Sequence, residues 1–388
     1  MQFEKVLPRI LLIVLLLFLL SSMISISLSQ IFLSISLLSW IILIIKKNRK
    51  FAVPSFFWIL AVYIILSVVS SFFSVNPEIS LKDCRELFLF LIIPLIYTGF
   101  NSEKELKNAN LAILASGFIS IIFSFLYFIF KAKPGERITG FMGHYMTQAG
   151  LLMLFACLSL SILCFYRTKN RTIWGLGFFL SLPALLLTYT RSAWIGLIIA
   201  ACIILFFYKP KILILMPVVV ALCYFLSPSS IRERALSIFS LNSPSNVERL
   251  EYARAGWMII KEFPLFGTGP DTVDMVFQNP KYELSKDARR NVHLHNNITQ
   301  IAAERGILTL LVWVIFIVWV FLSLIKLLKN KDPSVIPLAV AAIASLFALM
   351  VAGLFEYNFG DSEITTLFLY IITIPFAMER IGKIQEMN

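Results

Sequence analysis

Long apolar runs separated by short polar connections make up most of this chain. A run of roughly 17–25 apolar residues crosses a hydrocarbon core of about 30 Å as an α-helix, and such runs recur from end to end. Lys5 and Arg9 at the start of the first run resemble the beginning of a secretory signal, but no small-residue cleavage site follows the run. We therefore interpret it as a retained span. The pattern predicts about twelve transmembrane helices, at residues 8–27, 30–45, 54–73, 86–100, 109–130, 148–166, 173–190, 192–208, 211–227, 306–328, 335–355 and 363–381.

Composition points to the same class of protein. Of the 388 residues, 59% are hydrophobic and 14% are charged, whereas soluble proteins have about 25% charged residues. The number of cysteines is odd and most lie inside apolar runs, so we expect packing residues rather than disulfides. We therefore predict an all-α polytopic membrane protein in which residues 1–388 form a single integral membrane domain.

Lysine and arginine are distributed unequally between the two sides of the predicted membrane. Connections on one side carry clusters such as Lys46, Lys47, Arg49 and Lys50, while short loops on the other side carry far fewer basic residues. The positive-inside rule then places both termini in the cytoplasm. The net charge of +12 follows from this topology, so we expect membrane lipids as neighbours and no nucleic acid.

The one long connection, residues 228–305, lies on the outer side and separates the ninth and tenth predicted spans. It is too polar to cross the membrane and too long for a simple turn, so it is predicted to form an ordered module. EYARAGWMIIKEF at 251–263 has apolar positions at helical spacing, and the prolines and glycines of PLFGTGPD then interrupt the chain.

Unusual polar residues gather on this outer side. Each of the three histidines lies there, and isolated arginines lie next to apolar runs. The candidates are Arg137 and His144 ahead of a span, Arg191 in TYTRSAW, Arg249 early in the long connection, and His293, His295 and Asn296 at its end. An arginine at a helix end is often an interface anchor, but Arg191 interrupts an apolar stretch at a hairpin tip, which favours a functional role.

Three roles are open for the histidine pair. On an extended backbone His293 and His295 point the same way and can share a metal ion, with Asp271 or Asp274 folding back to complete the site. The pair can instead cap the helix that begins near Asn296. A neutral imidazole can also act as a general base near neutral pH. Phosphate-loop, GxSxG and dinucleotide motifs are absent from the sequence, and Glu356, Asp361 and Glu363 share one loop without an obvious partner for glycoside hydrolysis.

Several separated stretches resemble the superfamily of O-antigen ligases and Wzy-type polymerases. They are RITGFMGH at 137–144, YTRSAWIG at 189–196, RLEYARAGW to PLFGTGP at 249–270, HLHNNITQIAAERGILTLL at 293–311 and EYNFGDSEI at 356–364. About twelve spans with one large outer loop late in the chain also fit this superfamily. The resemblance covers roughly residues 50–380.

The resemblance implies a GT-C-like, all-helical glycosyltransferase of the bacterial inner membrane with its active site facing the periplasm. Such an enzyme takes its glycan from undecaprenyl diphosphate without metal or other cofactor, and a ligase passes it to lipid A–core. By matching position, His295 is the essential histidine and Arg191 and Arg249 are the essential arginines. Arg137 matches a further basic position, while His293, Asn296 and His144 are possible acceptor-binding or orienting residues.

The chemistry is consistent with these roles. Cleavage of the bond between the anomeric carbon and the diphosphate leaves negative charge on the diphosphate, which guanidinium groups bind bidentately. The acceptor hydroxyl needs a base, which His295 can supply, and attack from the opposite face predicts inversion. Asn296 or Glu304 is a possible orienting partner, with Glu304 favoured for a structural role.

Other functions compete with the ligase. A Wzy-type polymerase would use a second lipid-linked glycan as acceptor. A protein O-oligosaccharyltransferase usually carries extra C-terminal sequence. A transporter or flippase of lipid-linked glycan belongs to a different class and would show charges near mid-membrane and often an inverted repeat. The sequence has few charges at mid-span and no repeat.

Overall fold

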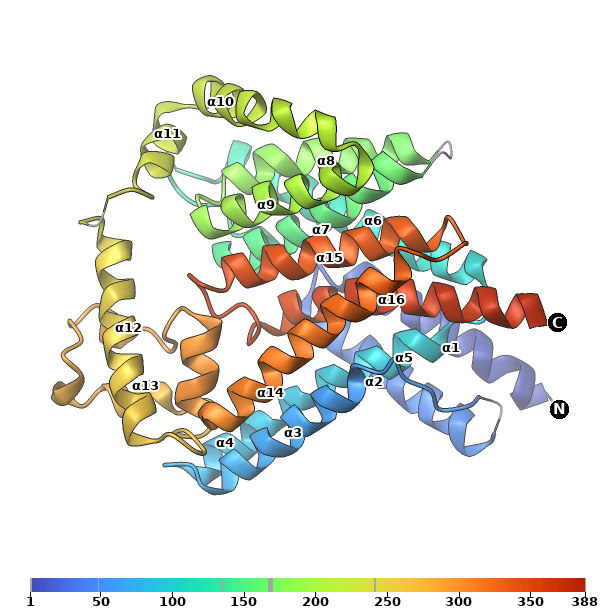
Figure 1. Cartoon of the computed structure of the whole chain (residues 1–388), viewed down its shortest axis with the longest axis horizontal. Helices are drawn as coiled ribbons and strands as arrows, with labels where there is room; N and C mark the ends of the chain where they lie inside the picture. The colour runs from blue at the N-terminus through green and yellow to red at the C-terminus, as the bar shows by residue number, and fades with distance from the viewer. Residues whose placement is uncertain (1, 48, 134, 167–169, 241, 388) are drawn as a thin grey trace.

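The computed structural model describes residues 2–47, 49–133, 135–166, 170–240 and 242–387. These residues are 77% helical and contain no strand, which confirms the predicted all-helical class. Figure 1 shows a bundle of helices that run side by side, with a further segment laid across one end. The beginning of the first helix and the end of the last lie together at the opposite end of the bundle.

Seven helices are long and apolar enough to cross a membrane in the part of the chain that the structure describes. They are α2 (Ile26–Ile45), α6 (Glu103–Phe130), α7 (Tyr145–Phe165), α9 (Arg191–Tyr208), α14 (Asn297–Leu327), α15 (Val335–Ala352) and α16 (Ser362–Met387). Shorter helical elements of the bundle are α1 (Gln2–Ser21), α3 (Phe57–Phe72), α4 (Pro77–Asp83), η1 (Cys84–Leu91), α5 (Ile92–Gly99), α8 (Arg171–Leu186), η3 (Pro210–Leu215) and α10 (Met216–Leu226).

Each predicted span overlaps helical residues. Two expected single helices are instead a 3₁₀ helix followed by a short α-helix: 86–100 consists of η1 and α5, and 211–227 consists of η3 and α10. The expected span at 306–328 belongs to α14, which begins at Asn297, nine residues earlier. Hydropathy located the apolar part of α14 but not its polar first turns, because those turns lie among other protein segments rather than in lipid. The total of about twelve membrane crossings stays a prediction.

Local sequence signals explain where helices begin. Ser102 precedes α6 and its hydroxyl accepts a hydrogen bond from the backbone N–H of Glu105 at 3.3 Å. Asn76 precedes α4 in the same manner, followed by Pro77 in the first helical turn. Such residues satisfy N–H groups that have no partner inside the helix.

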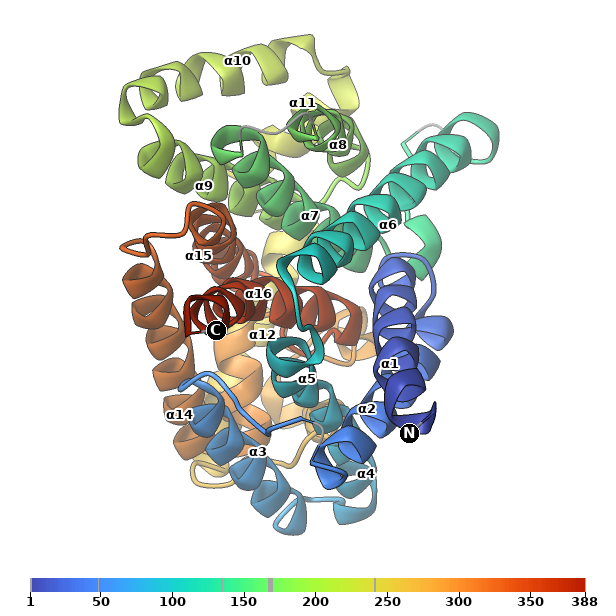
Figure 2. The ribbon, with the colours of Figure 1, turned by 90° about the vertical axis from the view of Figure 1, so that its right-hand side faces the viewer.

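The centre of the bundle is formed by α7, α15 and α16, whose side chains are mostly buried, while α2 and the apolar part of α14 expose large hydrophobic side chains outward. Figure 2 views the bundle along its helices and shows α16 surrounded by its neighbours. Alanines line much of α15, and Gly196 of α9 lies where an added Cβ would meet the backbone of Ala348. Small residues thus allow close helix contact, as is common between membrane helices.

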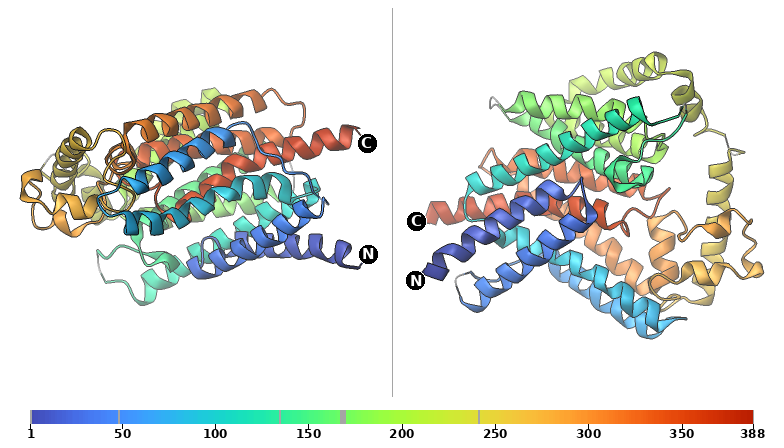
Figure 3. Two further views of the ribbon diagram at one scale, coloured as in Figure 1. Left: turned by 90° about the horizontal axis from the view of Figure 1, so that it is seen from below. Right: turned by 180° about the vertical axis from the view of Figure 1, so that it is seen from behind.

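The segment across the end of the bundle has its own small core. It contains α11 (Ser229–Leu236), α12 (Pro244–Glu262), α13 (Val273–Phe277), η4 (Pro280–Tyr282) and η5 (Ala288–Arg290). Tyr252, Ile259 and Phe277 are buried in that core together with Ala302 and Ala303 of α14. Figure 3 shows this segment at one end in both of its views. The first turns of α14 therefore join the segment to the bundle.

Gly306 divides α14 into two limbs. Its φ of 80° and ψ of 167° are not helical, and an added Cβ would overlap the backbone carbonyl of Leu265. The loop at 264–270 fills the break, where the N–H groups of Thr268 and Gly269 donate to carbonyls of α14 at 2.8 Å each. The glycines of PLFGTGPD therefore serve close packing against the first limb of α14.

Candidate functional site

His295 lies immediately before α14, in a backbone conformation that few residues adopt. Its φ is +49°, and non-glycine residues with positive φ often mark functional positions. The next residue, Asn296, caps the helix by accepting from the N–H of Thr299 at 3.0 Å, and its amide donates to the carbonyl of Leu354. Asn296 thus fills the capping role considered for the histidines, and its contacts fix the position of the preceding residue, His295.

Glu356 is the direct partner of His295. The Nδ1 atom of His295 lies 2.9 Å from a carboxylate oxygen of Glu356, and the two side chains are only 15% and 14% exposed. Burial alone would raise the pKa of Glu356, but the hydrogen bond with His295 and the electrostatic interactions with His295, His293 and Arg249 lower it. Glu356 is therefore an ionised acceptor, so Nδ1 carries the proton and Nε2 is left as the basic nitrogen.

The sequence did not single out this partner. Asn296 and Glu304 were the orienting candidates, and Glu356 was considered only with its loop neighbours. In the structure Glu304 instead pairs with Arg305 at 2.9 Å. The one available signal was that Glu356 opens the stretch EYNFGDSEI, directly after a predicted span. Because Glu356 and His295 are 61 residues apart in the sequence, no local pattern indicated their contact.

His293 occupies a different position from the one expected. Because φ at His295 is positive, the backbone is not extended there, and the two imidazole rings are 6.0 Å apart and inclined by 70°. The ring of His293 also lies 5.8 Å from that of Tyr357. Burial lowers the pKa of His293, although the charge of Glu356 opposes this effect. His293 is therefore an uncharged neighbour of the His295–Glu356 pair at neutral pH.

Two predicted arginines present guanidinium groups beside aromatic rings. Arg249, on α12, lies 5.6 Å from the ring centre of Phe355, and its Nε–H donates to the Phe355 carbonyl at 3.2 Å. Burial lowers the pKa of Arg249, and the charge of Glu356 raises it. Arg137 lies 4.3 Å from the ring centre of Tyr145. The terminal guanidinium nitrogens of Arg249 form no hydrogen bond among the described residues.

Arg191 is held firmly by the segment across the end of the bundle. It is only 5% exposed, and its two terminal nitrogens donate to the carbonyl and hydroxyl of Ser237, the hydroxyl of Ser245 and the side-chain oxygen of Asn246, at 2.6–2.9 Å. The planar fork thus fastens the link between α11 and α12 to the start of α9. A simple interface anchor would be exposed to headgroups and would not make these contacts.

A fourth arginine, Arg234, joins this group without having been singled out by the sequence. Its Nε–H donates to the carbonyl of Tyr189 at 3.1 Å. Burial, followed by the positive charges of Arg137, Arg191 and Arg249, lowers the pKa of Arg234 to about 10. We call these four residues the arginine cluster. The mutual repulsion shows that four cationic groups share one region, and an anion there would relieve it.

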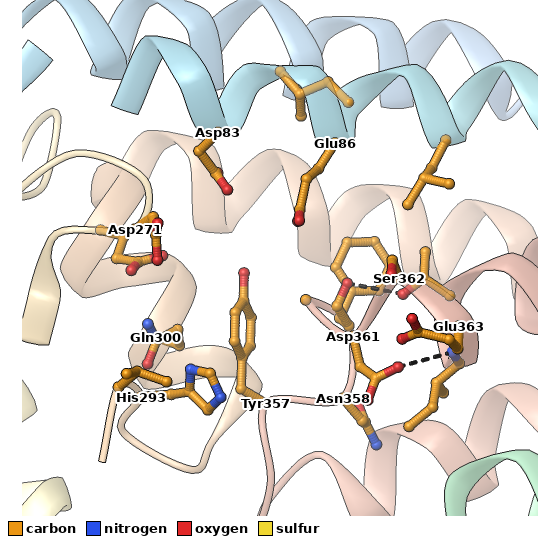
Figure 4. Close-up of a pocket in the computed structure, with 18 of the residues that line it drawn as sticks. Asp83, Glu86, Asp271, His293, Gln300, Tyr357, Asn358, Asp361, Ser362 and Glu363 are labelled. Carbon is orange, nitrogen blue, oxygen red and sulfur yellow. Dashed lines mark hydrogen bonds between the residues drawn. The ribbon is translucent and has the colours of Figure 1, made fainter. Parts of the chain in front are cut away.

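A cavity of about 740 Å³ lies on the other side of Glu356. His293, Glu356 and Tyr357 line it, as does His144. Most of its charged groups are carboxylates, so we call it the carboxylate cavity; they are Asp83, Glu86, Asp271, Glu304, Glu356, Asp361 and Glu363. Figure 4 shows carboxyl groups from separate segments directed into the same space.

An ion-pair network closes one wall of the carboxylate cavity. Arg305 contacts Glu304 at 2.9 Å and Asp83 at 3.4 Å, and it also donates to the hydroxyl of Tyr357 at 3.2 Å. This network connects α4 and α14, which are far apart in the sequence. On another wall, the hydroxyl of Thr147 donates to Asp361 at 2.6 Å. The cavity therefore has fixed walls built from several helices.

The structure also places the remaining candidates. His144 precedes α7 without capping it, stacks on Tyr145 and lies 3.5 Å from the Thr147 hydroxyl. Within the described ranges, no group of three or more histidine, cysteine, aspartate or glutamate side chains is arranged to hold a metal ion. Asp271 lines the carboxylate cavity but is not a partner of His295.

The fold and the site together define a multi-pass membrane protein with a polar, partly buried site at one end of its helices. Residues 176–314 match the family model described as O-antigen ligase. This match supports the resemblance to the superfamily of O-antigen ligases and Wzy-type polymerases that the motifs predicted. Members of the matched family are glycosyltransferase-like enzymes. The curated proteins contain no match to the chain.

Proposed function

We propose that this protein is an O-antigen ligase. It transfers a glycan from undecaprenyl diphosphate to a sugar hydroxyl of lipid A–core on the periplasmic face of the inner membrane, without a metal ion and with inversion at the anomeric carbon. Both termini are cytoplasmic in this proposal, since they lie at the end of the bundle opposite the segment that contains α11 and α12. The observation that carries it is the buried His295–Glu356 pair beside Arg249.

His295 is the general base. Glu356 holds its Nδ1–H, so Nε2 accepts the proton of the acceptor hydroxyl as the oxygen attacks the anomeric carbon. A carboxylate in this position also stabilises the imidazolium that forms, as in other histidine-based sites. Such a base contributes about 10²–10⁴-fold to the rate. Glu356 is the positioning residue of the pair.

The arginine cluster stabilises the leaving group. As the new bond from oxygen to the anomeric carbon forms, the bond from that carbon to the diphosphate oxygen breaks, and its electron pair stays on the diphosphate. The terminal nitrogens of Arg249 are available for phosphate oxygens, with Arg137 adding charge. Arg191 adds its charge and holds α11 and α12 in place through the contacts of its fork. Preorganised cations of this kind are often the largest catalytic contribution.

A reconstituted transfer assay tests this proposal. Purified wild-type protein receives an undecaprenyl-diphosphate-linked glycan together with either lipid A–core or more of the same lipid-linked glycan. We expect product on lipid A–core, lost with His295→Ala and reduced about 10²-fold or more with Glu356→Gln. Asp287→Asn is the matched carboxylate-to-amide control, because Asp287 forms only an exposed surface pair with Arg290.

The outcomes separate the competing functions. Normal transfer by His295→Ala, in protein that inserts and purifies like wild type, would reject the base assignment. Longer lipid-linked chains in place of the lipid A–core product would make the protein a Wzy-type polymerase, which belongs to the same superfamily. Movement of the intact lipid-linked glycan across a vesicle membrane without any transfer would favour a transporter.

A further inference from the structure

The proposed chemistry leaves the carboxylate cavity unassigned. We propose that it binds a sugar portion of a substrate that carries no negative charge, and that it prefers sugars with amino groups. This inference rests on the proposed function, because it gives a substrate class to the space next to the proposed base. It differs from the diphosphate site, which belongs to the arginine cluster.

Size and position make the cavity a binding site. Its volume of about 740 Å³ falls within the range of about 300–1,000 Å³ that is typical of ligand sites. It reaches the proposed reaction centre, since both His293 and Glu356 line it. The ring of Tyr357 also borders the cavity, as Figure 4 shows, and offers an apolar surface with a polar tip. A ligand in the cavity is therefore adjacent to the proposed catalytic pair.

The lining is rich in hydrogen-bond acceptors. Glu86, Asp271, Asp361 and Glu363 line the cavity, and none of them is in an ion pair within the described part of the chain. They come from η1, from the loop after residue 270 and from the start of α16, and Figure 4 shows them around one space. Asp361 already accepts from the hydroxyl of Thr147 at 2.6 Å and from the N–H of Ile364 at 3.1 Å, whereas the carboxyl groups of Glu86 and Asp271 accept no hydrogen bond among the described residues. Carboxyl oxygens accept hydrogen bonds, so the hydroxyl and ammonium groups of a sugar are suitable donors to Glu86 and Asp271.

The charge of the lining selects against anions. Seven carboxyl groups and three cationic side chains line the cavity, and one of these cations, Arg305, is already paired with Asp83 and Glu304. A phosphate or carboxylate on a sugar would face unpaired carboxylates, which raises its free energy in the cavity. An ammonium group would instead form charge-assisted hydrogen bonds, which are stronger than neutral ones.

A binding experiment tests this charge preference without requiring turnover. Isothermal titration calorimetry on the purified full-length protein would compare three soluble trisaccharides: a glucosamine trimer, its fully N-acetylated form and trigalacturonic acid. We expect the glucosamine trimer to bind about tenfold more tightly than the acetylated trimer, and the galacturonic acid trimer to bind most weakly.

Matched variants locate the effect in the cavity. Glu86→Gln/Asp271→Asn removes two carboxylates that form no hydrogen bond among the described residues, so the walls of the cavity should be retained. This variant should lose most of the preference for the glucosamine trimer. The control Glu78→Gln/Asp274→Asn changes carboxylates in the neighbouring helices α4 and α13 that do not line the cavity, and it should bind like wild type.

The results overturn or support the inference clearly. Equal affinity for the three trisaccharides, absence of binding by all of them, or an unchanged preference in the Glu86/Asp271 variant would overturn it. Because binding is measured without transfer, the two hypotheses can fail separately. If the three trisaccharides bind in the expected order of affinity but the protein transfers no glycan, the cavity assignment is retained and the proposed function is rejected. If the protein transfers glycan but binds the three trisaccharides equally, the proposed function is retained and the cavity assignment is rejected.

Kinetic competition identifies which substrate supplies the sugar. If the acceptor sugar occupies the cavity, the glucosamine trimer raises the apparent KM for lipid A–core and leaves that for the donor unchanged. If the glycan of the donor occupies the cavity, the trimer raises the apparent KM for the donor and leaves that for lipid A–core unchanged. Either result supports binding of a sugar, and lack of inhibition at concentrations that saturate binding would place the trimer outside the active site and overturn the inference.

Discussion

The arginine cluster and the carboxylate cavity lie in the same outer part of the molecule but have opposite charge. The cluster gathers Arg137, Arg191, Arg234 and Arg249, whose positive charges repel one another. The cavity gathers carboxylates from segments as distant in the sequence as Asp83 and Glu363. Glu356 connects the two regions, because it lines the cavity and interacts electrostatically with Arg249.

In the proposed function, this difference suits a substrate with two chemically distinct parts. A lipid-linked glycan has a diphosphate, which requires cations, and sugars, which require hydrogen-bond partners. Placing the two kinds of side chain in separate regions prevents them from neutralising each other. The His295–Glu356 pair lies at the boundary, where the bond between sugar and diphosphate would break. The expected experiments below alter one region at a time.

The largest effect after loss of His295 is expected from the cluster. Arg249→Ala removes a cation from the developing diphosphate charge, so kcat for transfer should fall about 10²–10³-fold. Arg254→Ala is the control, because Arg254 is exposed on the same helix. Steady-state kinetics with lipid A–core would measure both. Retention of wild-type kcat by Arg249→Ala would remove Arg249 from the reaction.

A smaller effect is expected from Arg191→Lys. Lysine keeps the positive charge but cannot reproduce a fork that binds Ser237, Ser245 and Asn246 together. Transfer should fall about tenfold or more, since each lost charged hydrogen bond is costly, and amide hydrogen exchange should increase over residues 229–246. Arg171→Lys, at an exposed arginine, should change neither measurement. Unaltered activity and exchange would show that the fork of Arg191 is needed neither for transfer nor for holding α11 and α12 in place.

The pH dependence of stability should change slightly with His293→Gln. Burial lowers the pKa of His293 in the folded protein, so the unfolded chain binds the proton more readily. Wild-type stability should therefore decrease as the pH falls from the ordinary histidine value of about 6.5 to the lowered value, and the variant should lack this contribution. Melting in detergent at pH 7.5 and 5.5 should differ between the two proteins on the order of 1 °C. Equal pH dependence would contradict the burial argument.

Removal of metal ions should have no effect on transfer. The proposed mechanism uses arginines for the diphosphate charge and needs no cation, so activity in excess EDTA should equal that of untreated protein. A loss of activity that added divalent metal restores would revive the hypothesis that His293 and His295 share a metal ion.

Much of the fold was predictable from local sequence. Apolar runs located the helices because a helix in lipid must be apolar along its length. A helix beginning near Asn296 was considered, but the sequence did not predict that it joins the span at 306–328 through a break at Gly306, against which the loop at 264–270 packs. The 3₁₀ segment η1 was likewise missed, because hydropathy does not distinguish it from an α-helix.

The candidate site was predicted only in part. Arg191 stood out because it interrupts an apolar stretch at a hairpin tip, whereas His295 and Arg249 were selected by their positions in motifs that resemble the superfamily. Arg234 did not, since it lies in a polar stretch where one more arginine is ordinary. The roles assigned to these residues stay predictions that the experiments above would decide.

The sequence by itself determined the all-helical membrane class and the resemblance to O-antigen ligases and polymerases, because hydropathy and short motifs are local properties of a chain. Only the tertiary structure decided that Glu356 partners His295, that Ser237, Ser245 and Asn246 occupy Arg191, and that carboxylates from several helices surround one cavity. Those contacts join residues separated by tens to hundreds of positions, and their geometry depends on how helices pack against one another rather than on any single stretch of sequence.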